Sequence, residues 1–138
     1  MMATSATKSA SHVGRSLLFG LGDAYYRVEL VHVKGVYPWA TLEEAPDGGV
    51  RRGVIGYLNL RGDKVPVVDL NDVVHGEPTK RLLGSRILLL DCISRGKTVT
   101  IGAVAGEVFA MARDENSTFA ERLNPCELLS SIVMGLAS

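Results

Sequence analysis

The stretch of sequence that decides the fold is Gly53-Val-Ile-Gly-Tyr-Leu-Asn-Leu-Arg-Gly-Asp-Lys-Val-Pro-Val-Val-Asp-Leu70. It contains two apolar runs, residues 54–60 and 64–70, and the tight-turn signal Arg61-Gly62-Asp63 between them. Two apolar runs joined by a short glycine turn predict a β-hairpin. Pro66 cannot donate a hydrogen bond to a strand ladder, so we expect it at a sheet edge or a bulge.

Upstream of this stretch, residues 17–21 and 25–30 are apolar or alternating runs separated by Gly22-Asp23-Ala24. This pattern predicts a second hairpin. Residues 31–37 continue as an apolar-rich segment that ends at Pro38, and residues 39–52 have the composition of a loop.

Downstream, residues 70–75 are expected to form one helical turn that ends before Gly76. Residues 86–93 and 97–104, joined by Ser94-Arg95-Gly96, predict a third hairpin. Residues 107–112 carry no decisive pattern. Asn124-Pro125 is expected to start a short helix that runs through Met134, because apolar residues recur at helical spacing after it. About seven short strands with glycine turns predict an all-β barrel or sandwich.

The size and charge of the chain limit the classes of fold and function that it can have. A chain of 138 residues can form one domain with a real core, or two very small lobes that share one. Its 15 basic and 15 acidic residues give a net charge of zero, which argues against a nucleic-acid binder and leaves protein partners open. Cys92 and Cys126 stand outside any CxxC and are expected to be small buried apolar residues, with a disulfide between them left open.

Catalytic and targeting signals are not evident. The three histidines are scattered, and neither Gly-x-Ser-x-Gly nor HExxH occurs, so we expect no enzyme, no cofactor and no metal. The sequence holds no apolar core of a secretion signal and no run long enough to span a membrane. We therefore expect a cytoplasmic protein without direct membrane insertion and with a flexible tail over residues 1–15.

The signature at residues 53–70 resembles that of the CheW-like domain family: an apolar strand ending in Asn-Leu-Arg-Gly, followed by Val-Pro-Val-Val-Asp-Leu. Residues 19–36 resemble the opening hairpin of that family, and residues 86–90 and 99–104 its later hairpin, so the resemblance covers roughly residues 17–111. It implies a CheW-like domain over residues 16–138, built as two intertwined SH3-like β-barrels around a shared core. It also implies a non-catalytic adaptor that couples the cytoplasmic tips of methyl-accepting chemoreceptors to a CheA-type histidine kinase.

Three features depart from the family pattern. The loop over residues 38–49 is shorter than the usual spacer of the family. Ala105-Gly-Glu-Val108 stands where the family often has Val-Asp-x-Val. Residues 132–137 resemble the penultimate strand of the family, and the sequence stops at Ser138, so the C-terminal strand region looks shortened. The first barrel is then closed by another element, completed by a partner or left with an open sheet edge, and an open edge can pair with another chain and lead to self-association.

The resemblance also implies four partner-binding residues. Arg61 matches the arginine of the Asn-Leu-Arg-Gly turn, a position implicated in receptor and kinase contacts; the alternative is a solvated turn residue. Val33, Val36 and Ile87 match apolar positions that border the receptor groove; the alternative for each is a place in the core.

Asp69 is expected to accept hydrogen bonds from nearby backbone donors rather than to act in catalysis. A different class of function remains as the alternative: a small β-barrel that binds nucleic acid, which would need a basic stripe interleaved with aromatic residues.

Overall fold

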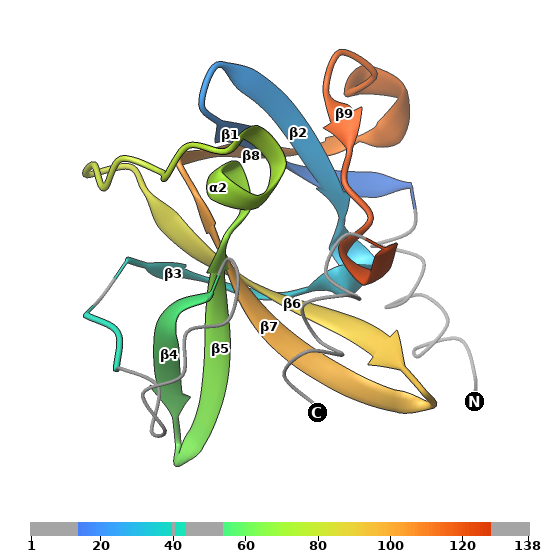
Figure 1. The fold of residues 1–138 in the computed structure, drawn as a ribbon. Coiled ribbons are helices and arrows are strands. Elements are labelled where there is room, and N and C mark those ends of the chain that lie inside the picture. Colours follow the sequence, from blue (N-terminus) through green and yellow to red (C-terminus); the bar gives the residue numbers. More distant parts are fainter. Residues whose placement is uncertain (1–13, 40, 44–53, 128–138) are drawn as a thin grey trace.

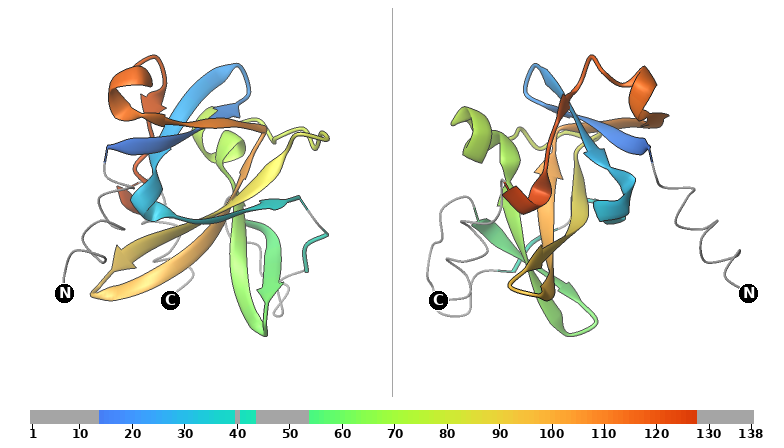
Figure 2. Two further views of the ribbon diagram at one scale, coloured as in Figure 1. Left: turned by 180° about the vertical axis from the view of Figure 1, so that it is seen from behind. Right: turned by 90° about the vertical axis from the view of Figure 1, so that its right-hand side faces the viewer.

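The structure is a computed structural model that describes residues 14–39, 41–43 and 54–127. These residues form two β-sheets with short helical turns between them, and the first sheet lies above the second in all three views (Figures 1 and 2). In chain order the elements are β1 (Arg15–Leu21), β2 (Ala24–Glu29), η1 (Leu30–His32), β3 (Val33–Pro38), β4 (Val54–Leu60), β5 (Asp63–Asp69), α2 (Leu70–His75), β6 (Arg86–Ser94), β7 (Lys97–Ala105), β8 (Glu107–Arg113), η2 (Asp114–Asn116) and β9 (Glu121–Arg122).

The first sheet has the strand order β8-β1-β2-β9. β1 and β2 form the predicted hairpin, and Gly22 takes the positive φ of 61° that their tight turn requires. Residues 107–112, which the sequence left open, belong to strand β8 and pair antiparallel with β1. The two-residue strand β9 pairs parallel with β2 on the other side of the sheet.

The second sheet has the strand order β3-β6-β7-β5-β4. The predicted hairpins β4–β5 and β6–β7 are both present, and each turns through an Arg-Gly pair in which both residues have positive φ. Pro66 lies opposite Tyr57 of β4, just before the point at which β5 begins to pair with β7 at Val67. The proline therefore precedes the stretch of β5 that has a partner strand on both sides.

The segment that follows β3 pairs with the outer edge of β4 through a single backbone bridge, which closes the second sheet into a small barrel. Glu43, in the segment after β3, exchanges two hydrogen bonds of 2.8 Å with Tyr57 of β4. Gly56 permits this approach, because a Cβ at that position would lie 2.7 Å from the Cβ of Leu42. The bridge leaves no room for a larger residue at Gly56.

The side chains on the two faces of β6 and β7 pack into two separate groups of buried apolar residues. Leu88 and Leu90 face the larger core, together with Phe19 and Val28 of the first sheet. Ile87, one residue before Leu88, belongs to the smaller core inside the second barrel. The arrangement confirms the expected all-β fold with a core shared between two small barrels.

The predicted helical turn is α2, and Asp69 explains where it begins. The buried Asp69 carboxylate accepts hydrogen bonds from the backbone N–H groups of Asn71 and Asp72, as an N-cap residue does. It also accepts from the backbone N–H and the hydroxyl of Thr79, at 2.8 and 2.6 Å. Gly76 ends the turn in the left-handed conformation. Asp69 therefore has the structural role that the sequence indicated.

A second cap marks the start of the helix expected near the C-terminus. The Asn124 side chain accepts from the backbone N–H groups of Cys126 and Glu127, and residues 125–127 are helical. The continuation to Met134, the strand resemblance at residues 132–137, Gly53 and residues 1–13 of the expected tail lie outside the described residues.

Candidate functional site: a partner-binding surface

Arg61 lies at the tip of the β4–β5 hairpin. Its backbone has a φ of +53°, and the next residue, Gly62, has a φ of +91°. The Asn59 side chain holds this turn by accepting a hydrogen bond of 2.9 Å from the Gly62 N–H. The exposed Arg61 guanidinium makes no hydrogen bond or ion pair with any described residue, so its five donors face solvent.

Val33 and Val36 lie on the same face of β3 although three positions separate them. A strand alternates its side chains, so such a spacing would normally place the two on opposite faces. A β-bulge at Lys34 adds one residue, and as a result Val33 lies opposite Leu90 and Val36 opposite Leu88. Val33 is half-buried against the larger core, whereas Val36 is 42% exposed.

Ile87 lies on the opposite side of the second sheet from these valines. Its side chain is 0% exposed and contacts the smaller core, which includes Val67 and Val104. Tyr37 of β3 is its direct cross-strand neighbour. Ile87 therefore has no surface to offer a partner in this conformation, and any part that it plays in binding is indirect.

The structure brings two of the four predicted residues together and keeps the others apart. We call Val33 and Val36, with the outer edge of β3, the β3 surface. β3 is an edge strand of the second sheet, and no described strand pairs with its outer side. Arg61 belongs to the same sheet but lies on the hairpin at its other edge (Figure 1).

Sequence reasoning missed an exposed aromatic cluster formed by Tyr25 and Phe109 of the first sheet and Phe119 of the turn before β9. The Tyr25 ring contacts the other two edge to face, with centroid distances of 5.4 and 6.0 Å. The Phe109 ring lies over Gly20, which pairs with Tyr25 in the sheet; a Cβ at Gly20 would be 3.5 Å from that ring. The only signal in the sequence was the strand alternation, which placed Tyr25 on the face opposite the buried Tyr26.

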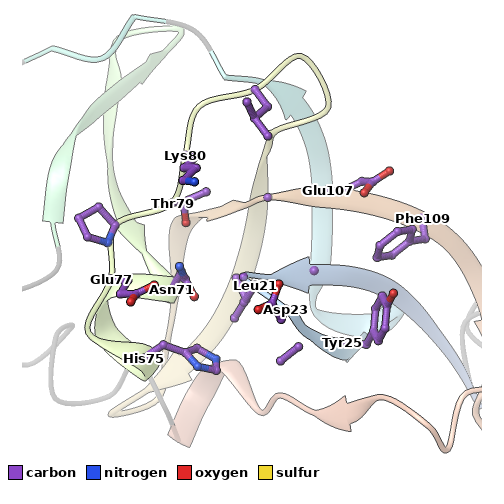
Figure 3. A pocket seen from close by; sticks show the side chains of 16 residues that line it. Leu21, Asp23, Tyr25, Asn71, His75, Glu77, Thr79, Lys80, Glu107 and Phe109 are labelled. Atoms are coloured by element: carbon purple, nitrogen blue, oxygen red, sulfur yellow. The ribbon is translucent and has the colours of Figure 1, made fainter.

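Beside this cluster lies a groove of about 940 Å³ between the β1–β2 turn, the α2–β6 connection and the start of β8 (Figure 3). Its lining includes Tyr25 and Phe109 together with three carboxylates, of Asp23, Glu77 and Glu107. Negative charge beside exposed aromatic rings repels a nucleic-acid backbone. The groove therefore gives no support to the alternative of a nucleic-acid binder.

Two ionisable groups, the Cys92 thiol and the Tyr26 hydroxyl, have a raised pKa. Burial raises the pKa of the Cys92 thiol to about 12, and contact with Cys126 adds to the shift. Both cysteines are free thiols. Burial, reinforced by the nearby Glu121 carboxylate, also raises the pKa of Tyr26, whose hydroxyl lies 3.1 Å from Nε2 of His75. Within the described residues, no three His, Cys, Asp or Glu side chains gather in a way that could hold a metal ion.

Comparisons with known proteins agree with the fold and with the signature at residues 53–70. Residues 15–122 match the model of the CheW-like domain family. The chain is 31% identical over 109 residues to a chemotaxis protein CheW of Rhizobium meliloti (strain 1021), an alignment that covers 70% of this chain and 69% of the relative.

The fold is similar to that of a solved structure, the scaffolding protein CheW of Thermoanaerobacter tengcongensis, with a TM-score of 0.62 and 24% sequence identity. That match covers 75% of this chain and 64% of the solved one, so the chain spans less than two thirds of the solved protein. In the part of the chain that the structure describes, every helix is too short or too polar to cross a bilayer. The chain therefore belongs to the CheW-like domain family, whose members are non-catalytic scaffold and adaptor proteins, and it is not an enzyme.

Proposed function

We propose that this protein couples the cytoplasmic tips of methyl-accepting chemoreceptors to a CheA-type histidine kinase, in chemotaxis or a related signalling pathway. Membership of the CheW-like family supports the proposal, as does the similarity to a protein named for chemotaxis. In this role the protein works in the cytoplasm and is held at receptor arrays by its partners.

The observation that carries the proposal is the β3 surface. Val36 is exposed beside the half-buried Val33, and the outer edge of the strand is free of described partners. An apolar strip of this kind suits the apolar face of a partner helix. The sheet beneath it is fixed by buried residues, Ile87 among them, so the strip is held in place before the partner arrives.

Arg61 supplies a second contact of a different chemistry. Its guanidinium has no partner among the described residues, so binding a carboxylate does not require an internal ion pair to be broken first. Arginine is one of the residue types most often found among the anchors of protein interfaces. We assign Arg61 to the receptor or kinase contact and the β3 surface to the receptor.

Co-sedimentation with a receptor cytoplasmic fragment and the kinase tests this assignment. Arg61→Ala is expected to weaken binding about 5- to 30-fold, the loss typical of an interface arginine. Arg95→Ala is the matched control, because Arg95 also has a φ of +53° in an Arg-Gly turn, on the β6–β7 hairpin. Folded wild-type protein that binds neither partner would contradict the proposal.

We also propose that a second copy of the protein can pair with the open edge of β8. No described strand lies beyond β8 in the first sheet. Met111 of β8 is exposed, and lysine on an edge strand opposes pairing between sheets. Met111→Lys is therefore expected to reduce self-association in sedimentation experiments, and an unchanged sedimentation profile would argue against pairing at β8.

A further inference from the structure

The only two cysteines of the chain, Cys92 and Cys126, lie far apart in the sequence and bring their thiol groups together in the fold. Cys92 lies on β6 opposite Val99 of β7 and is 4% exposed. By strand alternation it shares the face of β6 that Leu90 presents to the larger core. The Cys126 thiol forms a hydrogen bond with the Cys92 thiol, and both sulfurs are free thiols.

The segment that carries Cys126 is held in place by contacts that do not involve the sulfurs. Leu123 is buried in the larger core, and its N–H donates a hydrogen bond of 2.8 Å to the backbone oxygen of Arg27 on β2. The Asn124 side chain then accepts a hydrogen bond of 3.0 Å from the Cys126 N–H. In Figure 2 this helical turn, coloured red, lies beside the β6–β7 hairpin. Cysteines whose side chains point apart cannot be bridged without backbone movement, whereas these two already meet.

The two sulfurs differ in their access to solvent, which fixes the order in which they can react. Cys126 is partly exposed, whereas Cys92 is buried. Burial raises the pKa of Cys92 to about 12, and the hydrogen bond with Cys126 adds to the shift, so Cys92 is a thiol at neutral pH. An accessible cysteine meets an oxidant first, and a second cysteine beside it can then resolve the product into a disulfide.

We propose that Cys92 and Cys126 form a reversible disulfide by exchange with a low-molecular-weight disulfide such as oxidised glutathione. The Cys126 thiolate attacks one sulfur of the small disulfide, whose S–S bond breaks, and the first small thiol leaves with the proton that Cys126 gave up. The Cys92 sulfur then loses its proton and attacks the Cys126 sulfur. The mixed S–S bond breaks, and the second small thiol leaves with that proton. The cysteine pair loses two electrons, and the small disulfide gains them as it becomes two thiols.

The disulfide joins the two sheets covalently at the edge of the larger core. Cys92 belongs to β6 of the second sheet, and Cys126 follows β9, the last described strand of the first sheet. The closed loop contains β7, β8 and β9, so oxidation restricts the unfolded chain and stabilises the fold. In a reducing compartment such a bond forms transiently and follows the state of the thiol pool. It uses neither Arg61 nor the β3 surface, so it is independent of the proposed receptor and kinase coupling.

Redox titration of the full chain provides the test. The protein is equilibrated in glutathione buffers of graded oxidation, its free thiols are alkylated in urea, and the intact mass is measured. The wild type is expected to pass from a doubly alkylated monomer to an unalkylated monomer that has lost two hydrogens. Because the chain has no other cysteine, that mass assigns the bond to this pair. The oxidised monomer should also unfold at a Tm about 5–15 °C above that of the reduced protein.

Single substitutions separate the roles of the two sulfurs. Cys92→Ala should leave Cys126 as a mixed disulfide with glutathione, and Cys126→Ser, at a partly exposed position, should leave Cys92 reduced and free of glutathione. Neither variant should show the rise in Tm. The proposal is overturned if the wild type stays doubly alkylated across the series, if its oxidised product is a disulfide-linked dimer, or if it accumulates glutathione adducts without an internal bond.

Discussion

Replacing Arg61 by Asn is expected to stabilise the protein and at the same time to weaken its binding to partners. Arg61 occupies the first position of a two-residue hairpin turn at a φ of +53°, followed by Gly62 at +91°. Asn-Gly is the sequence that such turns favour, whereas a long side chain at positive φ is strained. The Arg61 side chain makes no hydrogen bond or ion pair with a described residue, so the substitution removes no polar contact within the described fold.

The size of the stabilisation follows from the backbone conformation. A residue other than glycine in the left-handed region is strained by about 1–2 kcal/mol, and asparagine relieves part of that cost by local hydrogen bonding. We therefore expect Arg61→Asn to raise the free energy of unfolding by about 0.5–1 kcal/mol, which for a chain of this length is a rise of roughly 2–5 °C in Tm. Arg95→Asn provides an internal replicate, because Arg95 has the same φ in the other Arg-Gly turn.

Urea unfolding followed by circular dichroism measures the effect as a higher midpoint with an unchanged slope. If both variants unfold at lower urea than the wild type, the strain argument is wrong. If only Arg61→Asn is destabilised, Arg61 makes a stabilising contact within the chain and its assignment to partner binding fails. On our reasoning both variants gain stability, and only Arg61→Asn loses affinity for the receptor fragment and kinase.

Three further substitutions test the interior. Asp69→Ala is expected to lower the free energy of unfolding by about 2–4 kcal/mol, because four donors lose a buried acceptor. Asp72→Ala, at an exposed position of the same helical turn, is the control and should cost at most about 1 kcal/mol. If Asp69→Ala and Asp72→Ala unfold at the same urea concentration, the capping role of Asp69 is contradicted. Gly56→Ala places a Cβ 2.7 Å from Leu42 and is expected to lower the free energy of unfolding by about 1–3 kcal/mol. An unchanged Tm would show that the segment around Leu42 can move away without loss of stability. Because burial raises the pKa of Cys92 from 9.0 to about 12, its contribution to stability is complete below pH 9 and is lost as pH rises toward 12; Cys92→Ala should lack this component of the alkaline decline.

The hairpins could be predicted from the sequence because their pairing is local. Each pair of strands is adjacent in the chain and joined by a short glycine turn, so turn chemistry identifies both the strands and their partner. β8 and β9 could not be placed in this way, because they pair with strands far away in the chain. β8 also lacks alternation: Phe109 and Ala110 are neighbours, yet both are exposed.

The candidate site was only partly predictable for a similar reason. The resemblance selected Val33 and Val36, but their common face depends on the bulge at Lys34, which leaves no mark in the apolar pattern. The full burial of Ile87 depends on the segment around Leu42 closing over the second barrel, a contact between distant parts of the chain. The acidic groove was not foreseen, because its carboxylates come from three separate segments.

Side chains alternate along β6, so that Ile87 packs in one core and Leu88 in the other. This strand therefore belongs to both barrels. Neither barrel can unfold without exposing the buried side chains on one face of β6, so we expect both barrels to unfold in a single thermal transition. Any ligand that binds the native fold at one barrel then protects the other by the same free energy. Amide hydrogen exchange in the first sheet should therefore slow when a partner binds the β3 surface, although that partner touches none of the exchanging groups.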